Sequence, residues 1–365
     1  IGDMAITYDT YEDLWEHSEV LEGVHEVLQE VAEADGVAAI SEAFVRGIDE
    51  DFGHKHVVAV SDERTAEGAR GEQRDQVVGV LALDPDRVIE LAVSPEGRHR
   101  GVGVGLFEAL RDKLGVSGAI DVWAHGDSAG AQRFVESLNA RRTRELLKMS
   151  LDCLPATKSA RNIEAKSTEA ADLCVAQGIE VLTYSESIER FDADSVDAEW
   201  VRVNNEAFAW HPEQGGWDSE RLRAARDTNW FEPDGVLMLW VRDHNSAAER
   251  VGIPCASEGG ESGEGTGCDD VFRLAGFHWT KIPLEEKEKD SGQRTGEVYV
   301  VCLSDDARGR GLGQAITLLG MKLLLDRGCG CIELYVEGDN APAVSTYKRL
   351  GFEVVHTDVV YRGRL

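Results

Sequence analysis

Basic residues are scarce in this sequence. Its 365 residues include 38 Lys and Arg against 68 Asp and Glu, which gives a formal net charge of −30 at pH 7. General nucleic-acid-binding proteins need clustered Lys and Arg to contact phosphates. The excess of acidic over basic residues therefore argues against general nucleic-acid binding. An anionic small-molecule ligand would need positive groups concentrated locally where it binds.

Long hydrophobic runs are also missing. No apolar run approaches the roughly 18 residues of a membrane-spanning helix, and no signal peptide opens the chain, so we expect no membrane association and a cytoplasmic location. The apolar fraction of 42% nevertheless supports packed cores. A chain of this length fits two domains of roughly 150–180 residues each.

Cysteine is sparse, with seven residues and no Cys-x-x-Cys pair. An odd number spread over a long chain is not typical of a secreted disulfide framework. Cys329 and Cys331 are separated by one residue, which in a strand places both on one face without enclosing a metal. The sequence therefore predicts reduced cysteines and no metal site.

The sequence repeats itself once. The stretch 87–107 matches 297–317 with a constant offset of 210, and each copy predicts a strand, a basic glycine loop and a helix (Leu106 to Leu114 and Ile316 to Leu325). Farther along, 121–131 matches 333–343 with an offset of 212. Two copies of one mixed α/β domain therefore follow one another in the chain.

The expected domains are residues 1–151 and 179–365, with a connector at 152–178 that contains a helical-looking patch from Asn162 to Gln177. Two polar, glycine-rich insertions, 64–75 and 256–270, predict exposed hairpin loops to which we assign no function.

The glycine loops predict a phosphate site. A strand that ends in Arg-x-x-Gly-x-Gly and continues as a helix presents backbone amides at the positive end of the helix dipole. Neither loop fits a dinucleotide fingerprint, because Leu106 and Ile316 occupy the third glycine position. Gly-Lys-Ser/Thr, the mark of a nucleoside-triphosphate loop, is absent from the sequence. The pattern thus favours a pyrophosphate-bearing ligand of another kind.

The C-terminal copy carries two motifs in order: Arg308-Gly-Arg-Gly311-Leu-Gly313, then Glu-Gly-Asp-Asn-Ala-Pro-Ala from Glu337, ending with Gly351-Phe352. This pair resembles the GCN5-related N-acetyltransferase (GNAT) family. The resemblance implies two tandem GNAT folds, each an α/β domain on a mixed sheet, with acetyl-CoA as cosubstrate. In the C-terminal copy the implied acetyl-CoA-binding residues are Val301, Cys302, Leu303, Arg308, Gly309, Arg310, Gly311, Leu312, Gly313, Gln314, Asn340, Ala341, Pro342, Ala343, Val344 and Ser345. In the N-terminal copy they are Leu91, Ala92, Val93, Arg98, His99, Arg100, Gly101, Val102 and Gly103.

Further motifs, at 200–217 and from Gly276 to Lys281, resemble the mycothiol synthases of actinobacteria, which are tandem GNATs. This resemblance implies acetyl transfer to the cysteinyl amine of Cys-GlcN-inositol, a thiol pseudo-disaccharide, by a monomeric enzyme. The residues implied in binding that acceptor are Glu42, Glu213, Lys281, Glu297 and Tyr335.

Amide formation at a thioester needs a base for the attacking ammonium, a stabilised oxyanion and a proton donor for the departing thiolate. Glu297, at the start of the strand before the loop, is the candidate base, and Tyr347, in the second helix, is the candidate acid. The repeat offsets place Arg87 and Val135 at these positions in the N-terminal copy. We therefore expect that copy to bind acetyl-CoA without turning it over.

Alternatives remain open from the sequence. His211 and His278 are rival bases, although each lies in aromatic surroundings that favour packing. The acceptor could be another small amine, such as an aminoglycoside or a peptide N-terminus. The other interpretation is a non-catalytic acetyl-CoA sensor, but a protein that only binds acetyl-CoA needs neither Glu297 nor Tyr347.

Overall fold

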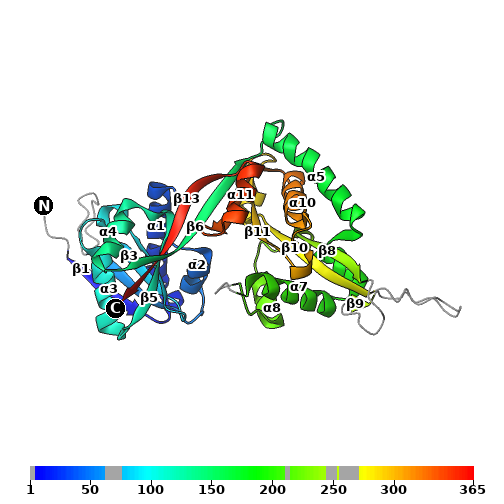
Figure 1. Cartoon of the computed structure of the whole chain (residues 1–365). Helices are drawn as coiled ribbons and strands as arrows, with labels where there is room; N and C mark the ends of the chain where they lie inside the picture. Colours follow the sequence, from blue (N-terminus) through cyan, green and yellow to red (C-terminus); the bar gives the residue numbers. More distant parts are fainter. Residues whose placement is uncertain (1–4, 62–75, 210–213, 244–252, 255–270) are drawn as a thin grey trace. The chain divides into compact units, whose positions relative to one another are not determined.

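The computed structural model describes residues 5–61, 76–209, 214–243, 253–254 and 271–365 (Figure 1). Both glycine-rich insertions lie outside the described residues. The chain divides into two compact units. The N-terminal unit comprises residues 1–147, 337–340 and 356–365, and the C-terminal unit comprises residues 148–336 and 341–355.

The N-terminal unit is built on a mixed sheet: in its described residues β4 and β5 pair parallel, whereas β1–β2, β2–β3, β3–β4 and β5–β13 pair antiparallel. Its strands, in spatial order, are β1 (Ile6–Tyr11), β2 (Lys55–Ser61), β3 (Gln76–Leu83), β4 (Val88–Val93), β5 (Ala119–Ala124) and the last part of β13 (Glu353–Arg364). Strand β6 (Arg141–Asp152) begins in this unit. Its helices are α1 (Ser18–Asp35), α2 (Glu42–Asp49), α3 (Val102–Leu114) and α4 (Ala129–Ser137), with short 3₁₀ turns η1 (Leu14–Glu16), η2 (Pro95–Gly97) and η3 (His125–Asp127).

Helices cover both faces of this sheet. Helix α1 buries Val24, Val27 and Val31, whose spacing of three and four residues gives the helix one apolar stripe. That stripe packs with α2 against one face of the sheet, while α3 packs against the other. Strand β3 is buried at every position after Gln76, as a strand covered on both faces must be.

The end of the chain completes the N-terminal unit. Residues Val359–Arg364 of β13 pair antiparallel with β5, and Tyr361 donates its hydroxyl to Asp127 at 2.7 Å. The sixth strand of this sheet therefore comes from the last residues of the sequence.

The C-terminal unit repeats the arrangement. Its strands, in spatial order, are β12 (Cys329–Glu337), β11 (Arg294–Leu303), β10 (Val271–Lys281), β8 (Val236–Asp243) and β7 (Ile179–Thr183), with β9 (Ile253–Pro254) on β10. Its helices are α5 (Lys158–Ala176), α6 (Tyr184–Phe191), α7 (Ala193–Phe208), α8 (Ser219–Arg226), α9 (Leu284–Lys287), α10 (Leu312–Asp326) and α11 (Ala341–Leu350), with 3₁₀ turns η4 (Pro233–Gly235) and η5 (Asp305–Ala307).

One face of the C-terminal sheet carries an aromatic core. Trp200 of α7, Trp240 of β8 and Trp279 of β10 are almost fully buried there, and the Trp200 and Trp279 rings meet edge to face at 5.3 Å. Because aromatic side chains bury large areas, this core fixes α7 firmly on the sheet. Helix α10 packs with α5 as well as with β11 and β10.

The mixed α/β fold expected from the sequence is confirmed. The expected helices after both glycine loops fall within α3 and α10, and the helical patch from Asn162 lies within α5. Across the described residues, no helix combines the length and apolar character needed to cross a membrane.

Candidate active site

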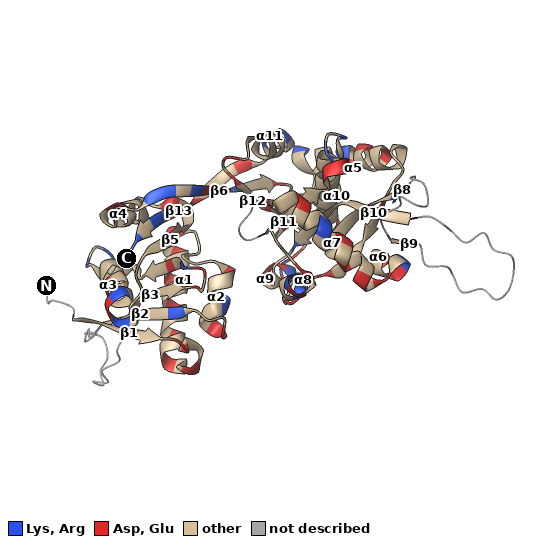
Figure 2. Ribbon diagram, turned by 60° about the horizontal axis from the view of Figure 1, so that its bottom comes forward, with Lys and Arg blue, Asp and Glu red and all other residues tan. Residues whose placement is uncertain are grey.

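Charge is distributed unevenly over the elements. Figure 2 shows Asp and Glu recurring on helices α1, α2, α6 and α7, whereas Lys and Arg gather along β6. The two glycine loops add Arg98 and Arg100 in the N-terminal unit and Arg308 and Arg310 in the C-terminal unit. Positive groups thus stand beside both loops despite the acidic total.

The C-terminal loop leads from β11 through η5 into α10. Gly309 and Gly311 adopt left-handed backbone angles, with φ of 75° and 80°, which glycine reaches without steric cost. Gly311 is the N-cap of α10, no side chain caps it, and Ala315 makes the first backbone hydrogen bond back to it. The amides of Leu312, Gly313 and Gln314 therefore lie in the uncapped first turn, where a helix favours an anion.

Strands β11 and β12 separate beside this loop. Within the described chain, their parallel pairing extends from Arg294 to Val298 and does not continue along Tyr299–Leu303. On its other side β11 stays paired with β10, so Val301, Cys302 and Leu303 each have a partner there. Backbone groups on the β12 side of this segment can therefore bond an extended, amide-containing ligand. Such a ligand would lead directly to the loop.

Glu297 lies just before the two strands part. It is paired in register with Lys281 of β10 and, on its other side, with Glu333 of β12. Directly opposed residues share one face of a sheet, with Cβ atoms roughly 5 Å apart. The Lys148 ammonium lies 2.7 Å from Glu333 and compensates its charge. Glu297 therefore stands between a cation and a carboxylate that already has a counter-ion.

Aromatic rings hold the ammonium of Lys281. Its Nζ lies 4.8 Å from the ring centre of Trp230 and 5.6 Å from that of Tyr299. A bulge between Trp279 and Thr280 makes Tyr299 the unopposed residue of β11, which re-aims its side chain. Trp230 was not expected from the sequence, because nothing local marks it as a partner of a residue 51 positions away.

The other expected site residues are spread over several elements. Tyr335 lies on β12, with Lys148 Nζ 5.7 Å from its ring centre. Asn340 precedes α11 and donates its amide to the Glu337 carbonyl, and residues 341–345 form the first turns of that helix. Glu42 opens α2 in the N-terminal unit. Glu213 and the rival base His211 lie outside the described residues.

Tyr347 lies on α11 and is almost buried, with 9% of its surface exposed. Burial raises the pKa of its phenol to about 12. Its ring meets Phe352 edge to face at 5.8 Å. The phenol is therefore protonated at neutral pH, the state that a proton donor requires. By contrast, burial lowers the pKa of His278 to about 4, and its Nδ1 lies 3.0 Å from the Ile316 carbonyl oxygen. These contacts support a packing role for this rival base.

The N-terminal unit repeats the loop and the strand separation. Gly101, with φ of 82°, caps α3, and β4 pairs with β5 only at Val88 and Ile89 in the described chain. Leu91, Ala92 and Val93 stay paired with β3. Both units therefore share the same backbone arrangement at the end of this strand.

The side chains around the two loops differ. In the N-terminal unit Arg98 donates two hydrogen bonds to Asp35, at 2.7 and 2.8 Å. At the positions of Glu297 and Tyr347 stand Arg87, which donates to the carbonyls of Ser117 and Ala119, and Val135, which lies in the core. The N-terminal unit has no proton-transfer group at either position.

A buried charged cluster in the N-terminal unit was missed by the sequence reasoning. His125 Nε2 lies 3.2 Å from Glu90, and its Nδ1 lies 3.3 Å from Asp358. Glu90 also accepts hydrogen bonds from the Ser41 amide and hydroxyl, at the N-cap of α2. The sequence offered one sign of this cluster, the acidic residue Glu90 at an inward position of a strand. Its partners could not be identified because they lie far away in sequence.

The charge state of this cluster follows from its contacts. Burial works against a charged imidazole, but the hydrogen bonds that it donates to Asp358 and Glu90, together with their negative charge, outweigh burial and raise the pKa of His125 to about 10. In the other direction, burial opposes ionisation of Asp358, but His125 and the Gly126 amide lower its pKa. Within the described chain, no group of three or more His, Cys, Asp or Glu residues is arranged to hold a metal ion.

Comparison with known proteins agrees with this arrangement. The model of the acetyltransferase (GNAT) family matches residues 219–352. The chain is 79% identical to a mycothiol acetyltransferase of Corynebacterium jeikeium, over 99% of this chain and 100% of that protein. It is 52% identical to a mycothiol acetyltransferase of Corynebacterium urealyticum, with the same coverage of both proteins. The chain belongs to the mycothiol acetyltransferase family.

Solved structures support the fold. A tandem GNAT protein from the clavulanic acid pathway has a TM-score of 0.59 at 16% identity, over 99% of this chain and 98% of its own. A GCN5-related N-acetyltransferase from Sphaerobacter thermophilus has a TM-score of 0.58 at 17% identity, over 98% and 95%. The tandem GNAT fold and the family resemblance inferred from the motifs are confirmed. As a member of this family the chain is an acetyl-transferring enzyme.

Proposed function

We propose that this enzyme moves the acetyl group of acetyl-CoA to the cysteinyl amine of Cys-GlcN-inositol, the last step of mycothiol formation. It would act as a monomer in the cytoplasm. The proposal rests most on Glu297, which pairs with Lys281 where β11 and β12 begin to part, on the strand that leads to the uncapped loop. Relatives with the printed name mycothiol acetyltransferase support this choice of acceptor.

The proposed chemistry has three steps. Glu297, directly or through a water molecule, takes a proton from the acceptor ammonium, and the neutral amine attacks the thioester carbonyl. A backbone amide near Leu303 stabilises the oxyanion. The carbon–sulfur bond then breaks as Tyr347 protonates the departing CoA thiolate. The attacking nitrogen gives up its second proton, which returns to the tyrosine through water, and the new amide and free CoA remain.

Lys281 has one proposed effect on this reaction. Its cation disfavours a charged amine close by and so favours the neutral nucleophile. We also propose that Glu42, Glu213 and Tyr335 bind the hydroxyl groups or the ammonium of the acceptor.

In the proposed division of labour, residues 179–365 carry the catalytic domain and 152–178 the connector. The N-terminal domain, 1–151, binds acetyl-CoA without transferring its acetyl group. Arg87 and Val135 at the two proton-transfer positions support this assignment. Arg98, Gly101 and the strand residues Leu91–Val93 would hold its coenzyme.

The deciding experiment compares five amines with acetyl-CoA in excess: Cys-GlcN-inositol, GlcN-inositol, free cysteine, an aminoglycoside and a short peptide. Acetylated product is counted by mass spectrometry, because the acceptor thiol interferes with thiol reagents. We expect strong preference for Cys-GlcN-inositol. Faster acetylation of an aminoglycoside or a peptide amine would show that this compound, and not Cys-GlcN-inositol, is the acceptor. Absence of turnover with every amine would favour a non-catalytic acetyl-CoA sensor.

A further inference from the structure

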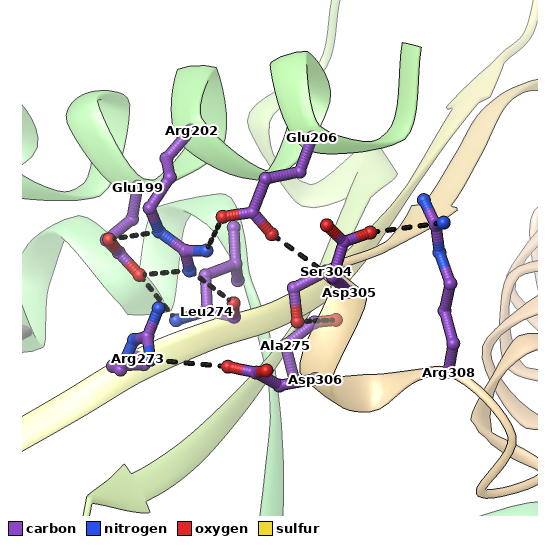
Figure 3. Close-up of polar contacts among 10 residues, drawn as sticks. All are labelled: Glu199, Arg202, Glu206, Arg273, Leu274, Ala275, Ser304, Asp305, Asp306 and Arg308. Atoms are coloured by element: carbon purple, nitrogen blue, oxygen red, sulfur yellow. Dashed lines mark hydrogen bonds and ion pairs between the residues drawn. The ribbon is translucent and has the colours of Figure 1, made fainter. Parts of the chain in front are cut away.

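Helix α7 reaches the coenzyme loop of the C-terminal unit through a network of charged side chains (Figure 3). Arg202 donates two hydrogen bonds to Glu199, each 2.7 Å, and one to Glu206 at 2.6 Å. Its guanidinium also donates to the Leu274 carbonyl at 2.8 Å. One arginine therefore joins two carboxylates of its own helix to strand β10.

The point of contact on β10 is a bulge. The pairing of β10 with β8 shifts between Leu274 and Gly276, which leaves Ala275 out of register. Glu199 accepts from the Leu274 amide at 2.8 Å, and the Ala275 carbonyl accepts from both the amide and the hydroxyl of Ser304, at 2.9 and 3.2 Å. Side chains of α7 and the first loop residue, Ser304, thus satisfy polar groups next to and within the bulge.

The network ends on the loop itself. The second oxygen of Glu206 accepts a hydrogen bond from the Asp305 amide at 3.2 Å, where η5 begins. Glu206 lies in the last turn of α7, where the helix dipole disfavours a negative charge. In the N-terminal unit Asp35 at the end of α1 also contacts its loop, but through the Arg98 side chain and not through a backbone amide. An acid at an unfavourable helix end contacts the loop in both units.

Both partners of the network are ionised at neutral pH. Burial alone would raise the pKa of Glu206, but hydrogen bonds from Arg202 and the Asp305 amide lower it. Burial likewise opposes the charge of Arg202, and its bonds to Glu199 and Glu206 raise its pKa. The bond to the loop is therefore a charge-assisted one, which is stronger than a neutral hydrogen bond.

We propose that Glu206 and Arg202 are positioning residues that hold the loop in the conformation that binds the pyrophosphate of acetyl-CoA. Glu206 acts through the Asp305 backbone, and Arg202 acts by orienting Glu206 and the Leu274–Ala275 bulge on which Ser304 rests. Neither side chain needs to touch the acetyl group or the acceptor. This inference rests on the proposed function, which assigns the loop to acetyl-CoA.

The test compares two acetyl donors in the full-length enzyme. Acetyl-CoA contains the pyrophosphate, and S-acetylpantetheine lacks it. For Glu206→Gln we expect KM for acetyl-CoA to rise about tenfold, the effect of weakening one charge-assisted hydrogen bond, with kcat within about twofold. The kcat/KM for S-acetylpantetheine should stay within about twofold. Arg202→Lys keeps the positive charge but loses the planar guanidinium that bonds two carboxylates at once. It should raise KM for acetyl-CoA in the same way.

Arg226→Lys is the matched control. Arg226 makes two 2.7 Å hydrogen bonds to Asp197 of the same helix α7, away from the loop. This variant should lower the melting temperature without changing KM for acetyl-CoA. Equal losses of kcat/KM with both acetyl donors in Glu206→Gln would indicate general disorder and overturn the proposal. An unchanged KM for acetyl-CoA would also overturn it.

Calorimetric binding of CoA separates this proposal from the acceptor assignment, because binding needs no acceptor. Weaker CoA binding by Glu206→Gln at the C-terminal site supports the network even if Cys-GlcN-inositol is not acetylated. Identical CoA binding by wild type and variant refutes it. Failure of wild-type enzyme to bind CoA would instead refute the proposed function and, with it, the role of the loop.

Discussion

Lys281 and Glu297 occupy directly opposed positions on the antiparallel strands β10 and β11. Their pairing places an ammonium, steadied by the rings of Trp230 and Tyr299, next to the carboxylate proposed as the base. Opposed residues share one face of the sheet, so these two side chains are neighbours across the strands. The proposed base and the cation beside it thus come from adjacent strands.

Replacing the proposed base tests its role directly. Glu297→Gln should lower kcat by about 10²–10⁴-fold, because a positioned general base contributes that much, while KM for acetyl-CoA changes little. Steady-state kinetics with saturating acceptor would measure this. Glu333→Gln, the neighbouring carboxylate on β12, is the control and should keep most activity. Wild-type kcat in Glu297→Gln would remove this residue from the mechanism.

Replacing the proposed acid should separate chemistry from binding. Tyr347→Phe removes only the hydroxyl, and we expect kcat to fall about 100-fold with CoA affinity nearly unchanged. The phenol, with a pKa of about 12, stays protonated at all lower pH. Any loss of wild-type rate between pH 8 and about 10 must therefore arise from another group. If the rate falls over that range in wild type but not in Tyr347→Phe, the tyrosine is the titrating group and its assignment as a buried acid is wrong.

The two glycine loops allow a matched comparison. Arg308→Ala with Arg310→Ala should raise KM for acetyl-CoA about tenfold or more, because two cations beside the phosphates are lost. The equivalent double change at Arg98 and Arg100 should spare most activity. Kinetics of both double variants under one salt condition would decide. A comparable loss of activity in both double variants would show that the N-terminal loop takes part in turnover.

The buried cluster predicts how stability depends on pH. Because the pKa of His125 is about 10 in the folded protein and about 6.5 when unfolded, the native state binds the extra proton between these values. The stabilisation is complete below pH 6.5 and is lost as pH rises toward 10. Hydrogen exchange of amides in β4 and β5 should therefore report lower opening free energies at pH 9 than at pH 7.

Besides its own carboxylates, Glu90 and Asp358, the cluster is faced by His54 and His356, so the variant His125→Gln is needed to assign the effect. It should flatten the dependence over this pH range. A slope that persists unchanged in the variant would attribute the titration to another group.

Local patterns in the sequence predicted the parts of the site that are local. The strand, the glycine loop and the following helix are contiguous, so residue order alone placed Gly311 at the start of α10. The periodic apolar residues of α3 and α10 likewise depend only on neighbours three and four positions away.

Distant contacts could not be predicted in this way. Trp230 beside Lys281 and Asp358 beside His125 depend on how strands and helices pack, which leaves no mark in the residues between them. The network on α7 was partly visible, since Glu199, Arg202 and Glu206 have helical spacing. That spacing is also typical of an ordinary solvated helix face, and the contacts with Leu274 and Asp305 distinguish the two.

The pairing of Val359–Arg364 with β5 has a consequence for synthesis. Chains emerge from the ribosome N-terminus first, and domains generally begin folding in that order. Here the first unit remains one strand short until residues 359–364 leave the exit tunnel. A gene cut near residue 150 would therefore yield an N-terminal half with an exposed sheet edge, prone to aggregate.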